Sequence, residues 1–272
     1  MNQDISICVL TENEMGWTEP FELDKVQILD NYYLSAQKSD IAFLKKMDTA
    51  RLLAGFRTTA GIDTKGVRPY GGWEDSLLGG HCVGHYLTAL AQAVKVTGDK
   101  ELKEKSQTLI AGLEECQKKL GTGFLFGAKV EDKEDVEKQF DILEGKKKGE
   151  TWVPWYNMHK VLAGLVDTYK YTGNETALLV AEKLGDWIYE RVSKWDLKTN
   201  QKVLETEYGG MNDCLYELYS YSHNKHHLEA AQKFDEKALF LMAAKGEKNC
   251  LDGKHANTQI PKFIGAIKRY NV

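Results

Sequence analysis

Four short segments combine histidine, aromatic, asparagine, carboxylate and glycine residues in a way that suits a sugar-binding site. Histidine, asparagine and aspartate side chains offer hydrogen bonds to hydroxyl groups, and aromatic side chains can stack on a ring face. The segments are YGGWEDSLLGGHCVGH (70–85), TWVPWYNMHK (151–160), EYGGMNDCLYE (207–217) and LDGKHANTQ (251–259). The aromatic candidates for stacking are Trp73, Trp152, Trp155 and Tyr156. These residue types favour a polyol over a hydrophobic ligand.

Carboxylates in the same segments raise the question of glycosidic chemistry. They are Glu74, Asp75, Glu207 and Asp213. Two carboxylates with different pKa values are the usual requirement for glycoside hydrolysis. A structural role is equally open for two of them, because Asp213 could cap a helix and Asp75 could close a turn.

Each histidine in these segments could bind a ligand or metal, or could have a purely structural role. His81 and His85 lie four residues apart on one helical face, but no third metal ligand is near them in sequence, so a buried hydrogen-bonded pair is favoured over a metal pair. His159 and His255 recur at equivalent places in their segments, which favours a pocket over a core role. Three further histidines are expected to face solvent at a turn: His223, His226 and His227.

A weak internal repeat predicts the elements that carry these segments. Apolar residues follow helical spacing almost throughout, and only four prolines interrupt the chain. Residues 85–117, 159–192 and 214–244 each read as two helices joined by a tight turn. Gly98 and Gly173 stand where a helix ends in positive φ, and Asn224 is the expected substitute in the third copy.

The two helices of each hairpin differ, and the difference predicts the architecture. The first is apolar nearly all round, whereas the second carries a charged stripe. Inner helices wrapped by outer helices make an all-α toroid, here with about four of six hairpins; unequal spacing of the turns favours it over an α-solenoid. The insert at 121–155 is expected to shape a pocket. Because inner helices of a toroid run parallel, the four segments should meet at one end of it.

Composition excludes several classes of function. The 272 residues carry a formal net charge of −4, which gives no long-range attraction to nucleic acid or anionic membrane. No apolar stretch approaches the roughly 20 residues of a membrane span and no signal peptide is recognisable, so the cytoplasm is expected. Five cysteines without CxxC spacing predict reduced thiols and no complete zinc site within the chain.

Longer motifs resemble a known family. They are RLLAGFRTTAG, RPYGGWEDSLLGGHCVGHYLTALA, WYNMHKVLAGLVDTYKYTGN, EYGGMNDCLYELY and HANTQIPKFIGAIKRY. Over about residues 24–272 they resemble the N-terminal catalytic region of β-L-arabinofuranosidase-like proteins, glycoside hydrolase families 127 and 146, formerly domain-of-unknown-function family 1680. The resemblance implies an (α/α)6 barrel that releases terminal β-L-arabinofuranose with retention. It also implies a zinc-bound cysteine nucleophile and a glutamate acid/base, with zinc held by cysteines and a further glutamate, all expected downstream of Val272.

The resemblance carries over to sugar-pocket positions only. His159 and His255 match histidines that contact the sugar, and His81 and Trp73 are expected in the pocket wall. Met211 stands where the family often has a histidine, so Asn212 and Asp213 are the expected substitutes there. Cys82 and Cys214 match no zinc ligand of the family and are expected to be small buried residues.

The whole chain is therefore interpreted as the N-terminal portion of such a barrel, with residues 1–23 as a leading segment. Ile260, Phe263, Ile264 and Ile267 form an apolar helix face that either a missing C-terminal half or a partner chain would cover. The isolated chain is expected to bind carbohydrate without turning it over. Two alternatives remain open: an α/α-barrel enzyme of the unsaturated glucuronyl hydrolase type using Asp75 and Asp213, and a non-catalytic glycan-binding protein.

Overall fold

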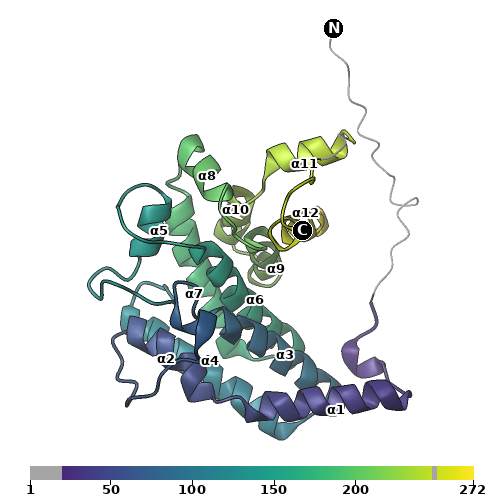
Figure 1. Cartoon of the computed structure of the whole chain (residues 1–272). Coiled ribbons are helices and arrows are strands. Elements are labelled where there is room, and N and C mark those ends of the chain that lie inside the picture. The colour runs from purple at the N-terminus through teal and green to yellow at the C-terminus, as the bar shows by residue number, and fades with distance from the viewer. Residues whose placement is uncertain (1–19, 247–249) are drawn as a thin grey trace.

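The computed structural model describes residues 20–246 and 250–272, and all regular structure within those ranges is helical (Figure 1). Most of the predicted leading segment, residues 1–23, lies outside the described residues. The helices are η1 (Leu23–Lys25), α1 (Asn31–Lys46), α2 (Thr49–Thr59), η2 (Gly72–Asp75), α3 (His81–Thr97), α4 (Lys100–Leu120), α5 (Lys138–Leu143), α6 (Pro154–Thr172), α7 (Glu175–Val192), α8 (Leu197–Leu204), α9 (Met211–Ser222), α10 (Lys225–Lys233), α11 (Lys237–Ala244) and α12 (Ala256–Asn271). The predicted all-α class is confirmed.

The three predicted hairpins are α3/α4, α6/α7 and α9/α10. Gly98 and Gly173 end their helices at φ +67°, as the turn sequences indicate. In the third copy the prediction is wrong by one residue, because His223 takes the left-handed conformation at φ +52°. Asn224 instead begins α10, where its side chain accepts a hydrogen bond from the N–H of His226.

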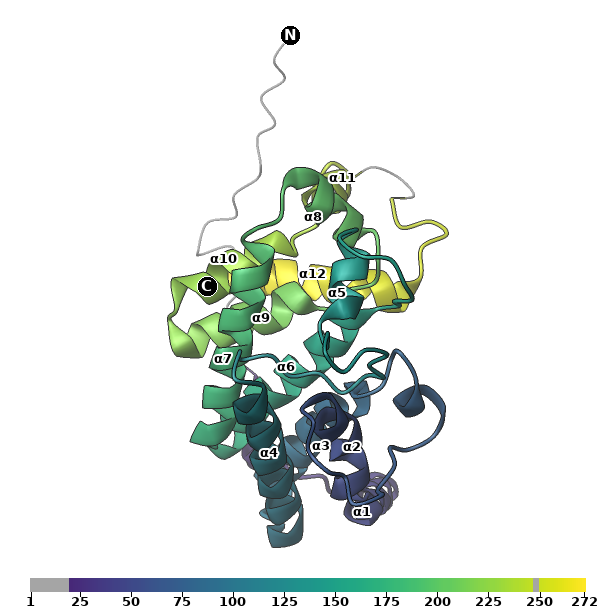
Figure 2. The same ribbon diagram turned by 90° about the vertical axis from the view of Figure 1, so that its left-hand side faces the viewer.

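The first helices of the hairpins form an inner row that continues into α12. Helix α3 packs along α6, α6 along α9, and α9 along α12, while α4, α7 and α10 lie on the outside of the row. Figures 1 and 2 show this order, with the N-terminal helices α1–α4 in one half of the molecule and α8–α12 in the other. The arrangement is toroid-like, with α12 as the fourth inner helix of the described chain.

Two glycines set the distance between α3 and α6. A Cβ atom on Gly84 would lie 1.8 Å from the carbonyl oxygen of Lys160, and one on Gly164 would lie 2.4 Å from the carbonyl oxygen of Gly84. Only hydrogen fits between these backbones, so the two inner helices approach as closely as helices can.

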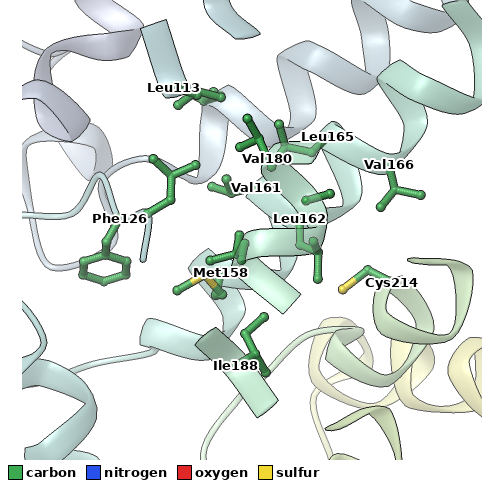
Figure 3. Close-up of a cluster of buried hydrophobic side chains, with 14 of the residues drawn as sticks. Leu113, Phe126, Met158, Val161, Leu162, Leu165, Val166, Val180, Ile188 and Cys214 are labelled. Carbon is green, nitrogen blue, oxygen red and sulfur yellow. The ribbon is translucent and has the colours of Figure 1, made fainter. Parts of the chain in front are cut away.

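The core lies between the inner and outer helices. Its aliphatic part, drawn in Figure 3, includes Leu113 of α4, Met158, Val161, Leu162 and Leu165 of α6, and Val180 of α7. These side chains are almost completely buried. An inner helix such as α6 is covered on every side, and its residues are therefore apolar nearly all round.

The insert at 121–155 covers this core with three of its aromatic residues. Phe124, Phe126 and Phe140 are buried and contact one another, and Phe124 and Phe140 also contact Trp187 of α7. Arg191 of α7 then fastens the insert by ion pairs to three of its carboxylates. They are Glu137, Asp141 and Glu144.

Candidate functional site

The four polar segments meet at one end of the inner row, as the sequence predicts. Asn157 at the start of α6 donates to the carbonyl of Gly79 before α3, at 2.5 Å. The N–H of Gly210 before α9 donates to Nδ1 of His159, at 2.9 Å. Asn257 of α12 donates to Glu207 before α9, at 3.2 Å. Each bond joins the start of one inner helix to that of the next, so the segments form one continuous polar edge.

His159 has its ring orientation and tautomer fixed by this edge. Because Nδ1 accepts the Gly210 N–H, the neutral ring carries its proton on Nε2 and can offer it to a ligand. Burial, with smaller contributions from Lys160 and His85, holds the pKa of His159 well below its usual value. The ring is packed against Gly209 and Gly210, where any Cβ atom would lie within 3.0 Å of it. His159 is therefore a preorganised neutral donor.

His81 and Cys82 begin α3 beside Glu74, which belongs to η2. Nδ1 of His81 lies 2.9 Å from Oε1 of Glu74 and 2.8 Å from the carbonyl oxygen of Leu78. Nε2 lies 3.7 Å from Sγ of Cys82. Burial disfavours the imidazolium, but the hydrogen bonds to Cys82 and Glu74 outweigh it and raise the pKa of His81 to about 10. This group contradicts the expectation that Cys82 is a simple buried residue, since Cys82 is only partly buried.

The prediction that His81 and His85 form a buried hydrogen-bonded pair holds for His81 alone. His81 is buried and hydrogen-bonded, whereas His85 is exposed and presents its ring edge-on at 6.2 Å between centroids. Partial desolvation by the neighbouring residues, followed by the positive charge of Lys160, lowers the pKa of His85. His85 thus contributes a neutral imidazole to the inner face, one turn along α3.

Aromatic residues surround His81, but not all of the predicted ones. The rings of Trp73 and Tyr156 lie 6.4 Å and 6.3 Å from that of His81, and Trp73 is 67% exposed. Trp152 is also exposed. The prediction for Trp155 is wrong, because it is completely buried against Phe140 and Phe234. Of the predicted aromatic residues, Trp73 and Tyr156 therefore lie beside His81, and Trp152 is exposed.

Asn212 and Asp213 differ in their surroundings despite being neighbours. Asn212 is completely buried, and its amide donates to the carbonyl of Lys262 and to Asp235, which holds α12 against α9. Asp213 lines a small cavity of about 110 Å³ with Asp167, Lys170 and Glu217 among its walls. Burial raises the pKa of Asp213 to about 6. Its predicted alternative role as a cap does not occur, since no side chain caps α9.

His255 and Asp75 occupy the exposed rim. His255 is the residue before α12 and its side chain makes no capping bond. Asp75 is exposed at the end of η2, and no hydrogen bond or ion pair joins it to another described residue. The two carboxylates of the glucuronyl hydrolase alternative thus lie in different surroundings, Asp75 on the exposed rim and Asp213 in the wall of a small cavity.

One large cavity lies away from this edge. It has a volume of about 830 Å³ and is lined by α8, α10 and the residues that lead into α11, including Trp195, Asn200 and Glu236. None of the predicted sugar-binding residues borders it. Hydrogen-bond geometry, not cavity size, marks the polar edge as the candidate site.

Two features of the described chain bear on metal and membrane. Glu74, His81 and Cys82 are the one group of described residues that could hold a metal ion. The four cysteines of the described ranges do not gather into one group, because Cys116 and Cys214 are buried in the core and Cys250 lies in a separate loop. Helices long and apolar enough to cross a membrane are not found among the described residues.

Comparison with known proteins decides the family. The family model described as Beta-L-arabinofuranosidase, GH127 catalytic domain, matches residues 25–272 of this chain. The chain belongs to the GH127 family. Among solved structures, Ara127N, a GH127 β-L-arabinofuranosidase from Geobacillus stearothermophilus T6, aligns with a TM-score of 0.53 at 16% identity. The GH127 β-arabinofuranosidase BT3674 aligns with a TM-score of 0.53 at 15% identity.

These two alignments show a shared fold. They cover 82% and 93% of this chain but only 35% and 43% of the solved structures, so this chain spans less than half the length of each. A search of curated proteins finds no match. The shared fold of the two GH127 structures agrees with the predicted all-α, toroid-like class.

Sequence patterns do not reveal the role of one residue of this GH127 chain. They mark Glu74 only as one of four carboxylates for glycosidic chemistry, yet it binds the N–H groups of Gly80 and Cys82 at the start of α3 as well as His81. The spacing from Glu74 to Gly80 and Cys82 is longer than that of a standard capping box. Only the turn through Gly79 and Gly80 brings the carboxylate back to the helix.

Proposed function

We propose that this chain recognises a terminal β-L-arabinofuranosyl unit of a glycan at the polar edge formed by the starts of α3, α6, α9 and α12. Membership of GH127 supports the substrate class. The single observation that carries the proposal is the bond from the Gly210 N–H to Nδ1 of His159, which aims a neutral Nε2–H donor at a fixed place. A sugar hydroxyl is the kind of acceptor that such a donor fits.

The other residues are assigned by their position on the edge. His81, held by Glu74, and Trp73 form the wall beside α3, and His255 lies on the α12 side. Asn212 supports the edge from within, since its amide is used to hold α12. Asp213 lies deeper along the inner face and can exchange a proton near neutral pH.

Binding of methyl β-L-arabinofuranoside by ligand-observed NMR tests the proposal. His159→Gln should weaken binding by about tenfold, the equivalent of one hydrogen bond of about 1.4 kcal/mol. His226→Gln is the matched control, because His226 is exposed on α10 and stacks on Tyr189. Equal binding by both variants and the unaltered chain would contradict the assignment of His159.

We further propose that the 272-residue chain alone does not hydrolyse the glycoside. The described residues contain no cluster of cysteines, and the nucleophile implied by the resemblance is a zinc-bound cysteine. Incubation with 4-nitrophenyl β-L-arabinofuranoside should release 4-nitrophenol no faster than buffer does. Release at a rate typical of enzymes, about 1 s⁻¹ or more, would overturn this part of the proposal.

A further inference from the structure

Glu74, His81 and Cys82 form a compact donor group at the start of α3. One ligand atom from each residue lies within 4.8 Å of those of the other two. Glu74 and His81 are more than nine-tenths buried, and Cys82 is partly exposed. Sugar recognition at the polar edge does not require a thiol, so the presence of Cys82 in this group needs a separate explanation.

The hydrogen bonds of His81 leave one nitrogen facing the thiol. Nδ1 has two acceptors, the carboxylate of Glu74 at 2.9 Å and the carbonyl of Leu78 at 2.8 Å, so this nitrogen carries a proton. Nε2 faces Sγ of Cys82 at 3.7 Å. A carboxylate that holds the far nitrogen of an imidazole is the usual support for a histidine that binds a metal through its other nitrogen.

The separation of Nε2 and Sγ also suits a shared metal ion. A tetrahedral ion with bonds of about 2.0 Å to nitrogen and about 2.3 Å to sulfur places those two atoms about 3.5 Å apart. Both atoms are held by the same helical turn, and Glu74 fixes that turn through the N–H groups of Gly80 and Cys82. The two donors therefore need little rearrangement to receive an ion.

We propose that His81 Nε2 and Cys82 Sγ bind a divalent ion of the borderline-soft class to which zinc belongs, with Glu74 as the residue that positions His81. Nitrogen and thiolate sulfur are the donors that this class prefers. The ion takes the place of the protons on Nε2 and Sγ, so binding releases protons to the solvent. Its remaining positions are open to water or to ligand oxygen atoms on the side of Trp73 and Tyr156.

This site differs from the zinc site that the resemblance implies. That site uses several cysteines and a glutamate ligand, whereas this one uses a single cysteine and a histidine from adjacent positions. The proposal does not rest on the sugar-binding function, because its test reads the metal and not the sugar.

Cobalt(II) absorption tests the proposal, since a thiolate bound to cobalt gives a charge-transfer band in the near ultraviolet. The whole chain carrying Cys8→Ser and Cys250→Ser is used, which leaves Cys82 and two buried cysteines, Cys116 and Cys214. One equivalent of cobalt should produce the band, and zinc should remove it by competition. The band should disappear when Cys82→Ser is added.

Two further variants separate a ligand from a positioning residue. His81→Gln should abolish the saturable binding, whereas Glu74→Gln should keep the charge-transfer band and weaken affinity by about 10- to 100-fold. Far-ultraviolet circular dichroism verifies that each variant is folded. If a folded chain gives no band, or a band that persists in Cys82→Ser, the proposal is overturned.

Discussion

At the scale of single residues, the exposure of each histidine depends on what packs against its ring. The sequence predicts a solvent-facing His227, but this residue is completely buried and bonds to the Ser222 hydroxyl at 2.8 Å. The reason is Gly185 of α7, whose missing side chain leaves room for this ring; a Cβ atom there would lie 2.7 Å from it. His226 is exposed but stacks on Tyr189 at 4.0 Å. Position at a turn does not by itself predict exposure.

Asp213 makes a residue-scale prediction about pH. Its pKa is about 6 in the folded chain, against a reference value near 3.8, so the folded state holds the extra proton between these values. Stability should therefore fall as pH rises from about 4 through 6. Asp213→Asn should remove this dependence and raise the free energy of unfolding at pH 7 by up to about 3 kcal/mol.

Urea denaturation of the unaltered chain and of Asp213→Asn from pH 4 to pH 8 measures this difference. Asp75→Asn is the control, because Asp75 is exposed and makes no ion pair with another described residue. Parallel stability curves for the unaltered chain and Asp213→Asn would refute the prediction.

At the scale of elements, close helix contacts bring the polar edge together. The crossing of α3 and α6 depends on Gly84 and Gly164, and it places His81 and Tyr156 near each other. The contact of α9 with α12 depends on Gly265, where a Cβ atom would lie 2.2 Å from the Asn212 side chain. The spacing between the helix starts that form the polar edge is thus set by these close contacts.

Gly84→Ala tests the first crossing. Alanine has the better helix propensity by about 1 kcal/mol, but its Cβ atom would overlap the Lys160 carbonyl, which belongs to backbone and cannot turn aside. The free energy of unfolding should fall by about 3 kcal/mol or more. Urea denaturation provides the measurement.

Gly71→Ala is the matched control for that substitution. Gly71 has φ −68°, and a Cβ atom added there would meet no neighbouring atom within 4 Å, so alanine should change stability by less than about 0.5 kcal/mol. A loss at Gly84 no larger than at Gly71 would show that the α3 and α6 backbones can separate without cost.

At the scale of the whole molecule, the inner row ends in an apolar stripe. Ile260, Ile264 and Ile267 of α12 are 58%, 47% and 66% exposed, as the sequence predicts for this face. Phe263 is less exposed because it contacts Phe240 of α11. Neighbouring exposed isoleucines on one helix form a surface of the kind that binds apolar partners.

Replacing all three isoleucines by serine tests the stripe. The triple variant should bind less of the dye ANS than the unaltered chain and should lose less than about 1 kcal/mol of stability, because the replaced side chains are largely exposed. Leu179→Ser is the control, since Leu179 is an exposed leucine on the outer helix α7. Unchanged ANS fluorescence in the triple variant would contradict the prediction.

The sequence by itself determined the first two hairpins, α3/α4 and α6/α7, with their turns at Gly98 and Gly173, and it pointed to the family. Helical spacing of apolar residues and the glycines at 98 and 173 are local signals. Motifs such as HANTQ point to families 127 and 146 without any knowledge of packing, and the family comparison shows GH127. The meeting of the four polar segments also followed, because parallel inner helices must begin at the same end. Local chemistry was sufficient for each of these.

Only the tertiary structure decided which side chains are free to act. Trp155 and Asn212 belong to polar segments yet are buried, because neighbouring helices cover them. Glu74, His81 and Cys82 form one group only because the turn through Gly79 and Gly80 folds the carboxylate back onto the start of α3. Exposure and the distances between donor atoms depend on contacts across the fold, and no spacing along the chain encodes them.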